Sequence, residues 1–132
     1  MKKNEIIEEW LKRALSNLTI ASKRKTSKDI LYEDLCFECQ QSVEKSLKAL
    51  LVFYNVDLII THSIALLVSK LADKGVVIPD FVKESVILSD YAVQTRYPGN
   101  YEPVTIDDFK QALQLAQKVY IWTLNIISDK NI

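Results

Sequence analysis

Glycine is scarce in this chain of 132 residues, which contains only Gly75 and Gly99. Folds rich in strands need frequent tight turns, where glycine is favoured, whereas long helices need few of them. Phosphate-binding loops of the Walker or dinucleotide type require several glycines at fixed spacing. The scarcity therefore favours an all-α fold and excludes those two kinds of nucleotide site.

Histidine and cysteine are rare too, with one histidine, His62, and two cysteines. A zinc site needs about four ligands, and a disulfide framework needs more cysteines. Cys36 and Cys39 have the C-x-x-C spacing, but a redox role requires a βαβ context and a thiol at a helix N-terminus. Both cysteines instead fall on the apolar arc of a predicted helix. We expect inert, buried thiols and neither a metal nor a cofactor.

An excess of one charge and long apolar runs are missing too. Seventeen basic residues match seventeen acidic ones, so no overall field favours nucleic acid or an anionic membrane. No apolar segment approaches the roughly 20 residues that span a bilayer. The first ten residues are charged and then amphipathic, unlike a signal peptide. We therefore expect a cytoplasmic protein that does not bind membranes.

What the chain does contain is apolar residues at helical spacing in nearly every segment. They predict five helices, at about 3–23, 30–54, 61–74, 79–94 and 105–128. With no repeat and no domain boundary, the prediction is a single domain over residues 1–132, an up-and-down helical bundle.

Several residues mark the predicted helix ends. Thr61 suits the N-cap of the third helix and Gly75 its C-terminal stop, while Pro79 can open the fourth helix. Thr105 and Asp108 have the spacing of a capping box at the start of the last helix.

The second helix is apolar around more than half of its circumference, which predicts a central position in the bundle. Gln41, Lys45 and Lys48 form a polar stripe on the opposite side, with Glu44 beside them. Two interpretations remain open. The stripe is the solvent side, where a Glu44–Lys48 pair contributes about 0.3–0.5 kcal/mol, or it is a functional surface.

His62, Arg96 and Tyr97 are further candidate site residues. His62 falls in the predicted first turn of the third helix and is either a general base or a structural histidine bonded to local backbone. Arg96 and Tyr97 open a segment rich in helix breakers. Either they bind a phosphate and stack on a base, or tyrosine packing and an arginine–carboxylate pair hold the segment in place.

The segment 36–51, Cys-Phe-Glu-Cys-Gln-Gln-Ser-Val-Glu-Lys-Ser-Leu-Lys-Ala-Leu-Leu, resembles the helix-two signature of HEPN domains (higher eukaryotes and prokaryotes nucleotide-binding). The resemblance continues through Thr61-His62-Ser63, Tyr91 and the segment 95–98. It implies an up-and-down helical bundle, usually dimeric, and nucleotide binding, for example of ATP or GTP. The positions that match the polar motifs of the family are Gln41, Glu44, Lys45, Lys48, His62, Arg96 and Tyr97.

The family resemblance also implies partners. Many members act beside a small, separately encoded nucleotidyltransferase, and others are toxin ribonucleases, as in toxin–antitoxin pairs, that use an arginine followed four to six residues later by a histidine. This chain has no such motif, because His62 follows Arg24 by 38 positions and precedes Arg96.

Three hypotheses follow. The first is a non-catalytic, homodimeric module that binds a nucleotide or docks a nucleotidyltransferase. The second is an RNA-cleaving enzyme that uses His62 with Arg96 or Tyr97. The third is a purely structural dimerisation or interaction protein.

Overall fold

The fold was analysed in a computed structural model that describes residues 1–23, 27–92 and 102–130. Throughout these ranges the regular structure is helical, and no strand occurs in them. The elements are α1 (Lys3–Ser22), α2 (Tyr32–Phe53), α3 (Ile64–Asp73), α4 (Asp80–Glu84), the 3-10 helix η1 (Ser85–Ala92) and α5 (Ile106–Lys130). The predicted all-α helical bundle is confirmed.

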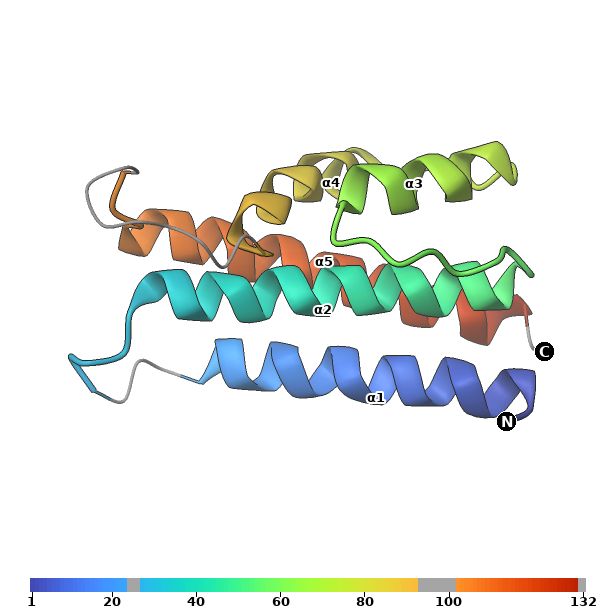
Figure 1. Cartoon of the computed structure of the whole chain (residues 1–132), viewed down its shortest axis with the longest axis horizontal. Helices are drawn as coiled ribbons and strands as arrows, with labels where there is room; N and C mark the ends of the chain where they lie inside the picture. Colours follow the sequence, from blue (N-terminus) through green and yellow to red (C-terminus); the bar gives the residue numbers. More distant parts are fainter. Residues whose placement is uncertain (24–26, 93–101, 131–132) are drawn as a thin grey trace.

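Helix α2 is the centre of the bundle. It lies between α1 on one side and the layer of α3 and α4 on the other, with α5 behind it (Figure 1). Helix α1 runs antiparallel to α2, but the segment that follows α2 first runs back along it, so α3 points in the same direction as α2 (Figure 1). This returning segment, residues 54–63, brings His62 beside the middle of α2.

Helices α2 and α3 end in the same capping motif. Asn55 and Gly75 have positive φ angles, 61° and 93°, and each follows the C-cap residue of its helix. The N–H groups of Val56 and Val76 donate to carbonyls five residues earlier, at 2.8 and 3.1 Å. These are Schellman motifs, in which a residue in the left-handed region ends the helix. Gly75 therefore stops α3, as predicted.

The start of α3 differs from the prediction. Ser63, not Thr61, is the N-cap, because its hydroxyl accepts a hydrogen bond from the Leu66 N–H at 3.2 Å. The Thr61 hydroxyl instead accepts from the Ser63 N–H at 3.0 Å and shapes the chain ahead of the cap. His62 consequently lies before the helix and not in its first turn.

The fourth helix is also shorter than predicted. Pro79 is the N-cap and not the first helical residue, and the α-helix ends at Glu84 before tightening into η1. At this junction the backbone N–H of Ser85 reaches the carbonyl of Val82, an i→i−3 contact of the 3-10 kind, and the Ser85 hydroxyl donates to the same carbonyl at 2.6 Å. Residues 93 and 94, where the predicted helix ends, lie outside the described residues.

Helix α5 begins with the predicted capping box. The Asp108 N–H donates to the Thr105 hydroxyl at 3.1 Å, and the Thr105 N–H donates to the Asp108 carboxylate at 2.9 Å. Two N–H groups that the helix leaves unpaired are thus satisfied by each other's side chains.

The apolar arc of α2 forms the core. Leu47, Leu50 and Leu51 are fully buried, as are Cys36 and Cys39. The buried position predicted for the two thiols is thus confirmed, and burial raises the pKa of the Cys39 thiol to about 12. Along the part of the chain that the structure describes, no helix has the length and apolarity needed to cross a membrane.

Candidate functional site

The polar stripe of α2 is largely buried. Glu44 is only 3% exposed, and the Lys48 side chain is 12% exposed. Gln41 and Lys45 are half-buried. The interpretation of this stripe as a simple solvent side is therefore wrong, because α1 and the returning segment 54–63 flank it and remove most of its charge from water.

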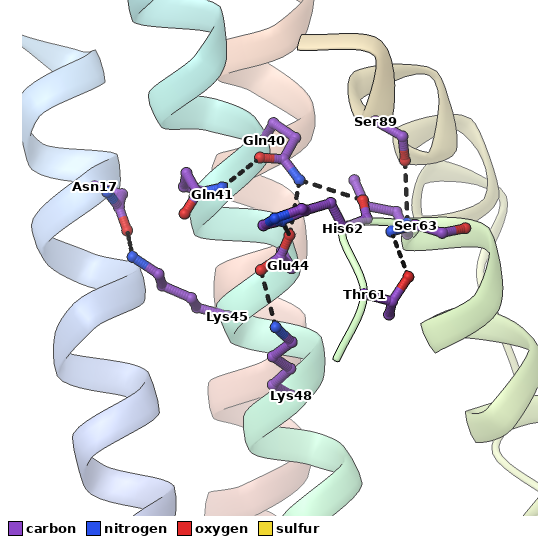
Figure 2. Close-up of polar contacts among 11 residues, drawn as sticks. Asn17, Gln40, Gln41, Glu44, Lys45, Lys48, Thr61, His62, Ser63 and Ser89 are labelled. Atoms are coloured by element: carbon purple, nitrogen blue, oxygen red, sulfur yellow. Dashed lines mark hydrogen bonds and ion pairs between the residues drawn. The ribbon is translucent and has the colours of Figure 1, made fainter. Parts of the chain in front are cut away.

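Glu44 is the centre of this network (Figure 2). Its Oε1 atom accepts a hydrogen bond from Gln40 Nε2 at 3.0 Å and lies 2.9 Å from His62 Nδ1. Its Oε2 atom accepts from Lys48 Nζ at 3.0 Å. One buried carboxylate thus holds three side chains, two of them basic.

Two opposing effects set the pKa of Glu44. Burial alone raises it, since a charged carboxylate loses its water, but hydrogen bonds from His62, Lys48 and Gln40 stabilise the charged form. The bonds together outweigh burial, and the pKa of Glu44 lies below its ordinary value. The carboxylate is therefore ionised at neutral pH.

Gln40 and Gln41 extend the network and fix its geometry. Gln41 Nε2 donates to Gln40 Oε1 at 2.8 Å, and Gln40 Nε2 also reaches the His62 carbonyl at 3.5 Å. Farther along, the Ile64 N–H donates to the Ser89 hydroxyl at 3.0 Å. The chain around His62 is thus attached both to α2 and to η1 (Figure 2).

His62 faces outward from this network. Its side chain is 70% exposed, although Nδ1 contacts a buried carboxylate. The expectation of a histidine bonded to local backbone is wrong, because its ring partner is Glu44, 18 residues away. A carboxylate that accepts from Nδ1–H fixes the imidazole ring and leaves Nε2 for a ligand or a proton. This is the arrangement that a binding or an acid–base histidine needs.

Lys45 lies at the edge of the polar stripe that faces α1. Its Nζ atom donates to Asn17 Oδ1 at 2.8 Å, and Asn17 Nδ2 donates to Glu38 Oε2 at 2.6 Å. Burial lowers the pKa of Lys45. A half-buried ammonium group held by a neutral amide keeps part of its capacity to bind an anion.

Lys48 connects the network to an aromatic side chain of α1. Its Nζ atom lies 5.4 Å from the centroid of the Trp10 ring, within the range of a cation–π contact. Trp10 and Lys45 also line an open groove of about 290 Å³. The other residues that line it are Met1, Ile6, Glu9 and Arg13.

The structure joins four of the seven predicted site residues in one hydrogen-bonded network, Gln41, Glu44, Lys48 and His62. Lys45 lies beside this network and is bonded to Asn17 of α1. Arg96 and Tyr97 lie outside the described residues. Within the described ranges, no three side chains of histidine, cysteine, aspartate or glutamate form a metal-binding group.

The prediction missed Gln40, Asn17 and Trp10. Gln40 was recognisable, because it lies four residues before Glu44 and a side chain there reaches the same face of a helix. Asn17 and Trp10 are seven residues apart on α1 and share a face, but no local signal says that this face meets α2.

Comparisons with known proteins agree with this fold. A family model described as HEPN domain matches residues 7–127. The chain is similar to the crystal structure of ST0689, an archaeal HEPN homologue, with 28% identity and a TM-score of 0.70 over 96% of this chain and 99% of the other. It is also similar to the crystal structure of TT1696 from Thermus thermophilus, with 30% identity and a TM-score of 0.74 over 90% and 96% of the two chains.

No curated protein matches the chain. The family model nevertheless covers nearly the whole sequence, and the helices that it spans carry both the core and the network around Glu44. This chain belongs to the HEPN domain family.

Proposed function

We propose that this protein is a single-domain, cytoplasmic binding module for nucleotides, and that His62 and Lys45 contact the phosphates. The observation that carries the proposal is the contact between the exposed imidazole of His62 and the buried carboxylate of Glu44. Burying a charged carboxylate costs free energy unless hydrogen bonds and counter-charges compensate for the lost water. Packing alone therefore gives no reason for a buried carboxylate that holds an exposed imidazole ring.

The exposure of the four side chains indicates which of them can contact a ligand. His62 is mostly exposed and Lys45 lines a groove, so these two groups have access to a ligand. Lys48 and Glu44 are almost covered and bonded to each other, and therefore act as positioning residues. A nucleoside triphosphate carries several anionic oxygens, which more than one cationic group can bind.

Calorimetric titration with ATP, GTP and a short RNA tests the proposal. We expect at least one of them to bind the folded protein, and His62→Ala and Lys45→Ala to weaken that binding about tenfold each, the loss typical of one charged hydrogen bond. Lys118→Ala is the matched control, because it removes the same charge from an exposed position of α5. If no nucleotide and no RNA binds the folded protein, the proposal is rejected.

A second function is favoured by the same contact. A carboxylate that orients an imidazole leaves Nε2 poised to accept or donate a proton, as RNA cleavage requires. Incubation of a labelled RNA with wild type and His62→Gln distinguishes the two functions. Cleavage by wild type alone makes the protein an RNA-cleaving enzyme, and intact RNA in both samples leaves the binding module.

The family also suggests partners, and exposed apolar side chains support contact with another protein chain. Leu15 and Ile20 on α1 and Ile121 on α5 are about half exposed. We propose a homodimer that docks a small nucleotidyltransferase. Light scattering across a range of concentrations tests the dimer, and co-purification with a nucleotidyltransferase encoded beside this gene tests the partner. A purely structural interaction protein would dimerise but bind neither nucleotide nor RNA.

A further inference from the structure

The groove beside Trp10 has two kinds of lining. Met1, Ile6 and Trp10 give it an apolar wall, and the charged side chains that line it are Glu9, Arg13 and Lys45. Trp10 and Ile6 are four residues apart on α1, and Arg13 follows three residues later, so one face of the helix builds the wall. A ligand that matches both linings has a flat apolar part and an anionic part.

We propose that this groove holds the base of the nucleotide, stacked on Trp10, while Arg13 and Lys45 take the phosphate nearest the sugar; the inference rests on the proposed function. It adds two residues to the site, Trp10 and Arg13, and a class of contact, base stacking. Aromatic rings and bases stack with little dependence on sequence, because every base has a flat face.

The size of the groove limits the occupant. A volume of about 290 Å³ is at the lower end of small-molecule sites. It suits one base with its sugar. The proposed occupant is therefore a mononucleotide, or one unpaired base at the end of a strand.

A cation already lies over the Trp10 ring. Lys48 Nζ lies 5.4 Å from the ring centroid, and the same ammonium group is bonded to Glu44. The indole ring is thus joined through Lys48 and Glu44 to His62. Arg13 is 60% exposed at its side chain, and its only described ion-pair partner is Glu9, at 3.1 Å, which lines the same groove. A phosphate competes with Glu9 for the guanidinium group, as an exposed pair of this kind is weak.

Intrinsic fluorescence isolates the groove, because the chain has only two tryptophans, Trp10 and Trp122. Trp122 packs edge-to-face against Phe81, with ring centroids 6.4 Å apart, and does not line the groove. A Trp122→Phe variant therefore reports on Trp10 alone. ATP is expected to quench this signal, whereas inorganic triphosphate, which has the charge but no base, is expected to bind without comparable quenching.

The affinity measurement uses the wild-type background. Trp10→Leu is expected to weaken ATP binding about 5- to 150-fold and to leave the binding of inorganic triphosphate unchanged. Trp10→Phe keeps an aromatic face and is expected to retain most of the ATP affinity, which separates stacking from a folding defect. Arg13→Gln is expected to weaken both ligands.

Two outcomes overturn the inference, and they differ in what else fails. If ATP and triphosphate bind equally well to wild type and Trp10→Leu, without quenching, the base lies elsewhere and the proposed function stands. If neither ligand binds the folded wild-type protein, the proposed function fails together with the inference.

Discussion

The two sides of α2 are both buried and are chemically opposite. One side carries Cys39, Leu47 and Leu50, which are fully buried among apolar neighbours. The other carries Glu44 and Lys48, which are almost as well covered but charged. Burial alone therefore does not separate the core from the site. Removing the apolar side from water stabilises the fold. Removing the charged side from water costs free energy, which hydrogen bonds and ion pairs must offset.

The two sides of α2 differ in what their burial contributes to stability. Replacing a buried ion pair by apolar residues of similar size is often neutral or stabilising, so such a pair is weak evidence of a stabilising role. A charged network in the middle of the central helix, with its one histidine turned to solvent, supports the proposal that this side serves binding. Four experiments test this distinction.

Removing Glu44 is expected to have the largest effect. Glu44→Ala leaves the covered Lys48 ammonium without its counter-charge, and we expect a loss of about 3–5 kcal/mol in the free energy of unfolding, measured by urea titration. Leu47→Ala is the matched change on the apolar side, with an expected loss of about 2–5 kcal/mol. A loss below about 1 kcal/mol for Glu44→Ala would show that the polar side is not tightly coupled.

Replacing both charges together is expected to have a smaller effect. In Glu44→Leu with Lys48→Met, no buried charge is left unpaired, but the buried Gln40 amide loses its acceptor on Glu44, and we expect a loss of at most about 1–3 kcal/mol. Nucleotide binding is expected to fall, because His62 loses the carboxylate that orients it. A double variant as unstable as Glu44→Ala contradicts the view that the network serves binding.

The pH dependence of stability sharpens the comparison on the polar side. The pKa of Glu44 is lower in the folded chain than its ordinary value of 4.5, so its stabilising contribution is fully present above pH 4.5. It is lost as the pH falls below 4.5 through the folded pKa. Urea titrations at pH 7 and pH 4 are expected to show a smaller loss in Glu44→Gln than in wild type. Equal losses in the two proteins would show that Glu44 does not contribute to the loss of stability at low pH.

The smallest effect is expected on the apolar side. The pKa of the Cys39 thiol is raised to about 12 by burial, so almost no thiolate forms at pH 8. Iodoacetamide is therefore expected to leave Cys39 unmodified in the folded protein and to modify it in urea, as read by mass spectrometry of the peptide. Rapid modification without urea would show that this side opens in the native state.

Local patterns were enough to predict the helices and some of their ends. The scarcity of glycine, the spacing of apolar residues and the pair Thr105 and Asp108 all act within one helix, and each prediction is confirmed. The start of α3 was predicted wrongly, because Thr61 and Ser63 are both good capping residues. In the structure Ser63 caps the helix, and Thr61 accepts a hydrogen bond from the Ser63 N–H.

The site was only half predictable. The helical wheel and the family signature placed Gln41, Glu44, Lys45 and Lys48 on one face of α2. They did not show that this face is covered, because the cover comes from residues distant in sequence. Asn17 lies 28 residues before Lys45, and His62 lies 18 residues after Glu44. Such contacts depend on how the helices pack.

The positive φ angle of Asn55 has an evolutionary consequence. If residue 55 were helical instead, α2 would be one residue longer and the chain would leave it after a further turn of about 100°. The returning segment would then run along a different face of the helix. His62 would then miss Glu44, although neither residue had changed. Among natural variants of this chain, position 55 is therefore expected to accept glycine and little else, since few other residues tolerate the left-handed conformation. A position that touches no ligand would thus be under the same selection as the site itself.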